Sequence, residues 1–313
     1  MFNDIAVIIG NTLIYSSPLI YTALGGVISE NAGVVNIGLE GLMVIGAFVG
    51  ATAGYFIGDP WIAFIIAGLA GGALAFFHAL ASIKYSANQV VSGIAMNFLG
   101  LGFALFLARV FFDGATTTKP VGFEDKMPRF LANMFPENSF LDIVLGNQYA
   151  TVFLAFILAF VIWYVLYKTR LGLRIRAVGE HPAAADTLGV NIYKIRYLAV
   201  VTSGIFAGFG GASMSLAIVS NFRPTLVSGQ GFIALAAVIF GRWKPQGALV
   251  ACLFFGFAQA LTIYLGGFEG FRVLGDLLNT VPYVITIVIL IIFAGKSMAP
   301  AADGVPYDKE EKH

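Results

Sequence analysis

The stretch PWIAFIIAGLAGGALAFFHALASI, residues 60–83, decides the class of this chain. It runs for 24 residues without an Asp, Glu, Lys or Arg. A helix that crosses the roughly 30 Å hydrocarbon core of a bilayer needs about 20 residues. A membrane-spanning β-strand would instead alternate apolar and polar side chains over about ten residues, and this stretch shows no such alternation. It therefore predicts a transmembrane α-helix.

The rest of the chain repeats this pattern. Of its 313 residues, 58% are hydrophobic and only 11% are charged, too few charges to cover the surface of a soluble domain. Uncharged stretches of 18 to 26 residues occupy 5–29, 41–58, 60–83, 85–108, 143–167, 197–222, 224–241, 245–268 and 277–295. We expect an all-α, polytopic bundle of about nine spans, with eight or ten as alternatives, in a single transmembrane domain over 1–313. The acidic N-terminal stretch MFNDIAVIIG predicts no cleaved signal peptide, and a net charge of +1 gives no indication of nucleic-acid binding.

The distribution of basic residues predicts the orientation in the membrane. With alternating loops, 12 of the 18 Lys and Arg residues fall on one side, including those of 168–196 and of the tail 296–313. An excess of Lys and Arg marks the cytoplasmic face, so we expect a cytoplasmic C-terminus and an outside N-terminus in the cell membrane. The long loop 113–147 is then extracellular.

The cytoplasmic loop 168–196 contains a short predicted helix. Pro182 is suited to the first helical turn, the alanines after it are strong helix formers, and Gly189 is placed to end the helix. About two turns are too few to span a membrane. Such a helix is suited to docking into a groove of another protein, or it serves only as an interfacial connector.

Polar residues inside the apolar stretches are candidates for a translocation pathway. Glu40 lies between two glycines at the start of an apolar stretch, one helical turn after Asn36. A carboxylate at membrane depth is costly unless it is paired or hydrated. Glu40 is either a structural residue at the cytoplasmic interface or a residue of the pathway or gate. The candidate pathway residues are Asn36, Glu40, Asn88, Gln89, Ser92, Asn97, Gln230 and Phe232, although buried amides also commonly join helices.

Glycine-rich interruptions occur in both halves of the chain. Gly38–Gly41 precedes one apolar stretch, and Gly229–Gly231 opens a short one. Interrupted hydrophobic segments in two halves of a transporter point to its substrate site. A separate pair, Gly204 and Gly208, fits the GxxxG pattern of close helix packing.

No catalytic or metal-binding pattern is found. The three histidines are scattered without ligand spacing, and the sequence lacks HExxH and GxSxG motifs. The phosphate-loop pattern that would end at Gly295-Lys296-Ser297 has Leu290 in place of its first glycine. We therefore expect neither catalytic residues nor a metal site, and no cofactor in this chain.

Three segments together resemble a known family. They are GVVNIGLEGLMVIGA (33–47), RAVGEHPAAADTLGVNIYKIR (176–196) and GFIALAAVIFGRWKPQGA (231–248). In this order they resemble permease subunits of ABC importers, in the branch that serves simple sugars, nucleosides and branched-chain amino acids. The likeness covers nearly the whole chain and is strongest to the second permease of nucleoside importers.

This resemblance implies partners and a mechanism. The chain would pair with a second permease or a second copy of itself, sit on cytoplasmic ATPase subunits that bind ATP and Mg, and receive solute from an extracellular binding protein. The loop helix would be the coupling helix, formed by Arg176, Gly179, Glu180, His181, Pro182, Ala183, Ala184, Ala185, Asp186 and Gly189. His181 stands where Asn is frequent in the family. The chain would not be an enzyme by itself. The alternative is an ion-coupled secondary transporter that works without an ATPase.

Overall fold

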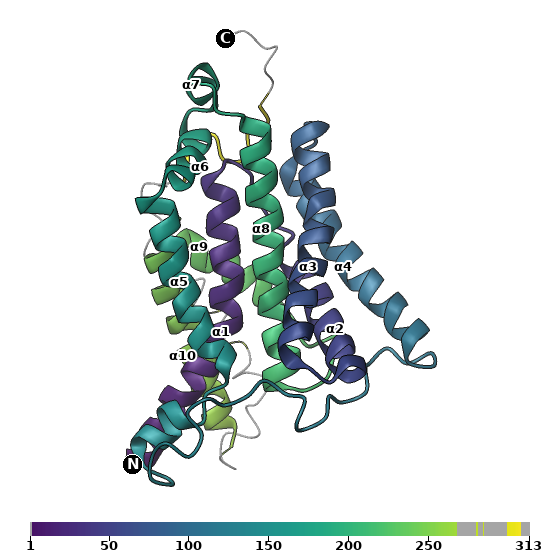
Figure 1. Ribbon diagram of the computed structural model, residues 1–313, viewed down its shortest axis with the longest axis vertical. Coiled ribbons are helices and arrows are strands. Elements are labelled where there is room, and N and C mark those ends of the chain that lie inside the picture. Colours follow the sequence, from purple (N-terminus) through teal and green to yellow (C-terminus); the bar gives the residue numbers. More distant parts are fainter. Residues whose placement is uncertain (1, 268–279, 281–283, 285–298, 308–313) are drawn as a thin grey trace.

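The computed structural model describes residues 2–267, 280, 284 and 299–307. Within these residues every regular element is helical, and the long helices run roughly side by side (Figure 1). The helices are α1 (Phe2–Asn31), α2 (Leu39–Ile57), α3 (Pro60–Ala79), α4 (Gln89–Phe111), α5 (Ala150–Lys168), α6 (Arg170–Glu180), α7 (Pro182–Thr187), α8 (Ile192–Ser213), α9 (Gln230–Phe240) and α10 (Pro245–Gly266). Three π-helical turns, η1 (Leu80–Lys84), η2 (Asp142–Gly146) and η3 (Met214–Ile218), complete them.

The all-α membrane bundle expected from the sequence is confirmed. Seven helical segments in the described part are long and apolar enough to cross a membrane, and they coincide with seven of the uncharged stretches. The stretch 224–241 contains only the 11-residue helix α9. The expected span 277–295, apart from residues 280 and 284, and half of the tail 296–313 lie outside the described residues. The expected number of about nine spans is not contradicted.

Helix α9 is short because the chain before it cannot be helical. Ser228 and Gly229 have φ of 40° and 88°, in the left-handed region, which glycine adopts without steric cost. Ser220 also has a positive φ, of 70°. The segment 219–229 is therefore an irregular connection, and α9 begins only after it.

Helix α8 is the centre of the bundle. It lies between α1 and α3 in Figure 1 and packs against α1, α2 and α3. Small residues permit this close approach, since a Cβ on Gly204 would lie 2.3 Å from the Cβ of Ala75, and one on Gly208 would lie 2.5 Å from the carbonyl oxygen of Ala67. The GxxxG pair therefore lies at a helix–helix contact, as its pattern predicts.

The two ends of the bundle differ in character. The start of α1 and the long connection between α4 and α5 lie at one end, whereas α6, α7 and the described tail segment 299–307 lie at the other (Figure 1). The basic segment 168–196 belongs to the second end. Its short helix α7 begins at Pro182, and Gly189, with φ of 79°, follows it. Helix α6 is absent from the elements expected from the sequence.

Candidate functional site

The first break in the bundle is the non-helical segment between α1 and α2. Its backbone groups bond to polar side chains of neighbouring helices. Gln89 Oε1 accepts from Val35 N at 2.7 Å, and His78 Nε2 lies 3.1 Å from the Val35 carbonyl oxygen. Asn97 Oδ1 accepts from Gly41 N at 2.8 Å, and its Nδ2 donates to Ile37 O at 3.1 Å. Irregular backbone at membrane depth needs such partners because lipid offers none.

Three further candidate pathway residues lie around the same region. Asn36, fully buried, donates from Nδ2 to Ser203 Oγ of α8 at 2.9 Å. Ser92 Oγ lies 2.9 Å from His78 Nδ1. Asn88, exposed, caps the start of α4 by accepting from two backbone N–H groups. Four of the eight candidates thus belong to this break or help to hold it. Asn36 lies in it, Gln89 and Asn97 bond to its backbone or to the first turn of α2, and Ser92 lies beside His78.

The structure brings the two glycine-rich interruptions into direct contact. Glu40, half-buried at the start of α2, accepts from Gly229 N through Oε1 and from Gly231 N through Oε2, both at 2.7 Å. A Cβ on Gly231 would lie 2.5 Å from the Cα of Glu40, so only glycine permits this approach. The carboxylate faces the first N–H groups of α9, which have no partner within the helix and form the positive end of its dipole.

This geometry gives Glu40 a structural contact, which is one of the two roles that the sequence left open, with a partner at the start of α9 that the sequence did not indicate. The carboxylate fastens the start of α9 to the start of α2, and so joins the two breaks. Whether it also contacts solute stays a prediction, as does the pathway role of the other candidates.

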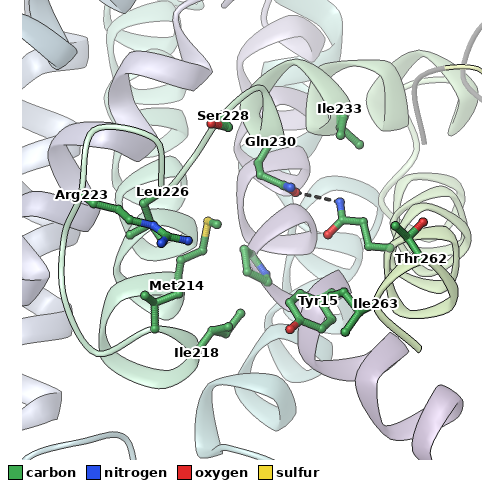
Figure 2. Close-up of a pocket in the computed structure, with 13 residues that line it drawn as sticks. Tyr15, Met214, Ile218, Arg223, Leu226, Ser228, Gln230, Ile233, Thr262 and Ile263 are labelled. Atoms are coloured by element: carbon green, nitrogen blue, oxygen red, sulfur yellow. Dashed lines mark hydrogen bonds between the residues drawn. The ribbon is translucent and has the colours of Figure 1, made fainter. Parts of the chain in front are cut away.

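The second break is the irregular connection 219–229 before α9, and a cavity of about 490 Å³ adjoins it. It is lined by residues of α1, η3, the segment 219–229, α9 and α10, and Figure 2 shows their side chains around one space. Gln230, the first residue of α9, lines it and accepts through Oε1 from Gln259 Nε2 of α10 at 3.0 Å. Arg223 reaches it from the irregular connection. Phe232, 48% exposed, is not among the lining residues.

Sequence reasoning found Gln230 but missed the other cavity residues. Gln259 was recognisable as an amide inside an apolar stretch, but nothing in the sequence connected α10 to the second break. Arg223 is the single charged residue between the uncharged stretches 197–222 and 224–241, and its position in the sequence indicated only a loop.

The end that holds α7 forms a second candidate site. Ala183 and Ala184 are exposed, Leu188 just after α7 is 84% exposed, and Ala185 is buried. His181 is exposed and precedes the first helical residue, Pro182. The helix therefore presents a small-residue face followed by an exposed leucine.

The elements beneath α7 are tightly joined to the bundle. A Cβ on Gly179 of α6 would lie 2.2 Å from the carbonyl oxygen of Asn31, the last residue of α1. Arg176 donates from Nε to Leu166 O at 3.1 Å, and its guanidinium lies 4.8 Å from the centre of the Tyr167 ring. Movement of α6 would therefore act directly on α1 and α5.

The described tail segment closes over the same elements. Ala302 N donates to Gly179 O at 2.8 Å, and Ala301 N donates to Glu180 Oε2 at 3.3 Å. Tyr307 Oη donates to Asp186 Oδ2 at 3.2 Å. Nothing in the sequence pattern indicated that the tail packs onto the expected coupling helix.

Buried charges lie under this tail. Arg196 of α8 is 1% exposed and donates from Nη1 to Val305 O at 3.0 Å. Glu30 of α1 is 3% exposed, and the Trp243 indole N–H donates to its carboxylate. Burial raises the pKa of Asp303 to about 7, and the nearby Arg196 guanidinium opposes this rise. Arg196 thus binds the start of α8 to the tail, and Glu30 binds the end of α1 to Trp243, between α9 and α10.

In the part of the chain that the structure describes, His, Cys, Asp and Glu side chains form no group of three that could hold a metal ion. The single cysteine, Cys252, is buried and free. The polar side chains described above hold the two breaks in the helices or line the cavity.

Together, the spans, the two joined breaks and the cavity between helices define a multi-pass membrane protein of the transporter class. The chain belongs to the family described as branched-chain amino acid transport system / permease component, which matches residues 8–294.

Two relatives are similar over almost the full length, and a third over about three quarters of it. The chain is 45% identical to the guanosine ABC transporter permease protein NupQ of Bacillus subtilis (strain 168), with 98% of each chain covered. It is 41% identical to the nucleoside ABC transporter permease protein NupC of Lactococcus lactis subsp. cremoris (strain MG1363), with 99% of each covered. The putative glucose ABC transporter permease protein TsgC13 of Haloferax volcanii is 38% identical over 78% of this chain and 73% of its own. No solved structure matches the chain significantly.

Proposed function

We propose that this chain is the membrane-spanning permease subunit of an ATP-driven importer of nucleosides or simple sugars. The observation that carries the proposal is the exposed helix α7, which follows α6 at the basic end of the bundle. Relatives named as nucleoside and glucose permeases, similar over most or all of the chain, support the class of solute.

The basic end is the cytoplasmic face in this proposal. It contains the basic segment 168–196, and an excess of Lys and Arg marks the inner side of a membrane. The C-terminus is then cytoplasmic, and the connection between α4 and α5 is extracellular. That connection is placed to meet a solute-binding protein.

The proposed partners follow from the same arrangement. An ATPase subunit binds ATP and Mg and holds α7 in a groove through Ala183, Ala184 and Leu188. A second permease, or a second copy of this chain, completes the pathway. The chain itself supplies no catalytic group and no cofactor.

The mechanism is alternating access driven from α7. When the ATPase subunits close, they displace α7 and α6, and the contact of Gly179 with the end of α1 transmits the displacement. Helix α8 moves with them through the tail and Arg196. The joined breaks at Glu40 and Gly229 are the points at which α2 and α9 tilt, because non-helical backbone bends at lower cost than a helix.

The test is to place a bulky side chain on α7. In a reconstituted complex of this chain, its second permease, the ATPase and the binding protein, Ala184→Trp is expected to reduce ATP-driven uptake at least about tenfold, because it blocks the fit of α7 to its groove. The matched control is Ala73→Trp, an exposed alanine of α3 that lies outside both α7 and the connection between α4 and α5. Normal uptake and normal ATPase stimulation in Ala184→Trp would contradict the proposal.

An ion-coupled secondary transporter is not favoured, because the relatives similar over the full length are permeases of ABC transporters. It would transport solute in proteoliposomes without the ATPase under an ion gradient. Uptake that requires both ATP and the ATPase excludes it.

A further inference from the structure

The cavity beside α9 has features that narrow the class of solute. It measures about 490 Å³, within the roughly 300–1,000 Å³ of small-molecule sites. Its walls come from both ends of the sequence, from Tyr15 and Pro18 of α1 to Thr262 and Ile263 of α10. Its lining includes Ser228, at the end of the second break, and Gln230, the first residue of α9 after it. Transporters hold their solute beside such breaks.

The cavity lining combines seven apolar side chains with six polar or charged ones. The apolar side chains are Pro18, Met214, Ile218, Val219, Leu226, Ile233 and Ile263. A monosaccharide carries hydroxyl groups around its whole ring, and each one buried without a partner costs about 1–3 kcal/mol. A nucleobase has two apolar faces and confines its polar groups to its edge. A lining that is about half apolar and half polar therefore fits a base with its attached ribose better than a sugar alone.

The polar groups of the cavity suit the edge of a base. The amides of Gln230 and Gln259 meet at 3.0 Å, one from α9 and one from α10, and Figure 2 shows Gln230 directed into the space that Arg223 and Tyr15 also face. Glutamine and arginine pair with the paired donors and acceptors of purine edges. Aromatic rings, such as that of Tyr15, stack on base faces.

The charge of the cavity excludes a strongly anionic solute. Arg223 is the only charged side chain among the described residues that line it. A nucleotide would bring about two negative charges of its phosphate into a site with one cation, where unpaired charge is costly. A nucleoside brings none.

We propose that the cavity beside α9 binds a nucleoside, with the base edge on the Gln230–Gln259 amide pair and a base face against Tyr15. This inference rests on the proposed function, which it narrows to one class of solute. It also assigns Gln259 and Arg223, which lie more than 30 residues apart in the sequence, to one site.

A labelling experiment tests occupancy without turnover. Ile263 lines the cavity and is 47% exposed. The native Cys252 is 0% exposed, so it is expected not to react with maleimide. In the complete complex that carries Ile263→Cys, guanosine is expected to slow maleimide labelling about tenfold, and ribose at the same concentration is expected to leave it unchanged. Phe123→Cys, 88% exposed at the opposite end from α7, controls for an effect of nucleoside on the reagent.

Substitution of the amide pair then tests the assigned contacts. Gln259→Leu is expected to abolish the protection by guanosine and to reduce guanosine uptake about tenfold. Gln246→Leu, an exposed glutamine at the start of the same helix and outside the cavity, is the matched control and keeps both. If Gln259→Leu does not assemble with the ATPase, the milder change Gln230→Asn takes its place and is expected to reduce protection and uptake in the same direction.

The outcomes separate the two proposals. ATP-driven guanosine uptake by the wild-type complex without protection of Ile263→Cys, or with equal protection by ribose, overturns the cavity assignment and leaves the importer standing. Equal effects of Gln259→Leu and Gln246→Leu also overturn it. A wild-type complex without ATP-driven uptake of any nucleoside or sugar overturns the proposed function itself.

Discussion

Replacement of Glu40 by alanine is the most direct test of how the two breaks are joined. The carboxylate accepts two hydrogen bonds of 2.7 Å, from Gly229 N and Gly231 N, and no other side chain bonds to these two groups in the described residues. Alanine removes both acceptors. The start of α9 then faces the methyl group of alanine, and the N–H groups of Gly229 and Gly231 lose their side-chain acceptor.

The size of the effect follows from these contacts. A hydrogen bond to a charged group contributes about 1.5–3 kcal/mol, so two such bonds give about 3–6 kcal/mol. Glu40 is only half-buried, and solvent at the exposed side favours the lower end, about 3 kcal/mol. At roughly 2–4 °C per kcal/mol for a chain of this size, Glu40→Ala is expected to lower the Tm by about 6–12 °C.

The assay is thermal unfolding of the detergent-solubilised complex, followed by size-exclusion chromatography after heating. Glu124→Ala, an exposed acid in the connection between α4 and α5, is the control and is expected to shift the Tm by less than about 2 °C. Glu40→Gln retains one acceptor oxygen and directs an amide N–H at the other backbone donor. It should lie between the wild-type protein and Glu40→Ala.

The same series distinguishes the two roles considered for Glu40. If the role is structural, uptake by Glu40→Gln falls in proportion to its loss of stability. If the carboxylate also serves the pathway, uptake falls while the Tm stays near that of the wild-type protein. A Tm of Glu40→Ala equal to that of the Glu124→Ala control would refute the geometry on which this reasoning depends.

Two further predictions concern packing and pH. Gly211→Val places a side chain where an added Cβ would already lie 1.9 Å from the Met43 carbonyl oxygen; it should separate α2 from α8 and prevent recovery of a monodisperse complex, whereas Gly102→Val, where the added Cβ meets nothing within 4 Å, should not. Burial raises the pKa of Asp303 from 3.8 to about 7, so the attached tail binds a proton that a detached tail releases between these values. Attachment of 299–307 should therefore weaken as the pH rises from about 4 to about 7 and then level off. Hydrogen exchange in this segment, corrected for its intrinsic pH dependence, should show the change, and Asp303→Asn should remove it; a dependence that persists in that variant would contradict the assignment.

Much of the fold could be predicted from the sequence because the lipid environment leaves few alternatives. A long, continuously apolar stretch is expected to be a helix in a bilayer, because a helix satisfies its backbone groups within its own segment and the stretch lacks the alternation of a barrel strand. The stretch 60–83 became α3 and η1 for this reason. The short helix after Pro182 was also predicted, because capping residues act locally. Helix α6 was missed, because the basic side chains around Arg174 indicated an exposed loop and not an amphipathic helix.

The candidate site was predicted only in part. Asn36, Gln89 and Asn97 stood out as amides inside apolar stretches. The partners of Gln89 and Asn97 are backbone groups whose irregularity no periodicity reveals, and the partner of Asn36 is Ser203 on a helix far away in the sequence. The packing of the tail onto Gly179 and Arg196 was not foreseen, because contacts over more than 100 residues leave no local pattern.

By itself the sequence determined which segments are spans, which end is basic, and where glycine interrupts a helix, since hydrophobicity, charge and backbone freedom are properties of single residues and short stretches. Only the tertiary structure decided that the interruption near Glu40 meets the one near Gly229, and that Gln230, Gln259 and Arg223 surround one cavity. Those pairings depend on how the helices pack in three dimensions, where steric fit at residues such as Gly231 selects one arrangement from many that the same hydrophobic pattern allows.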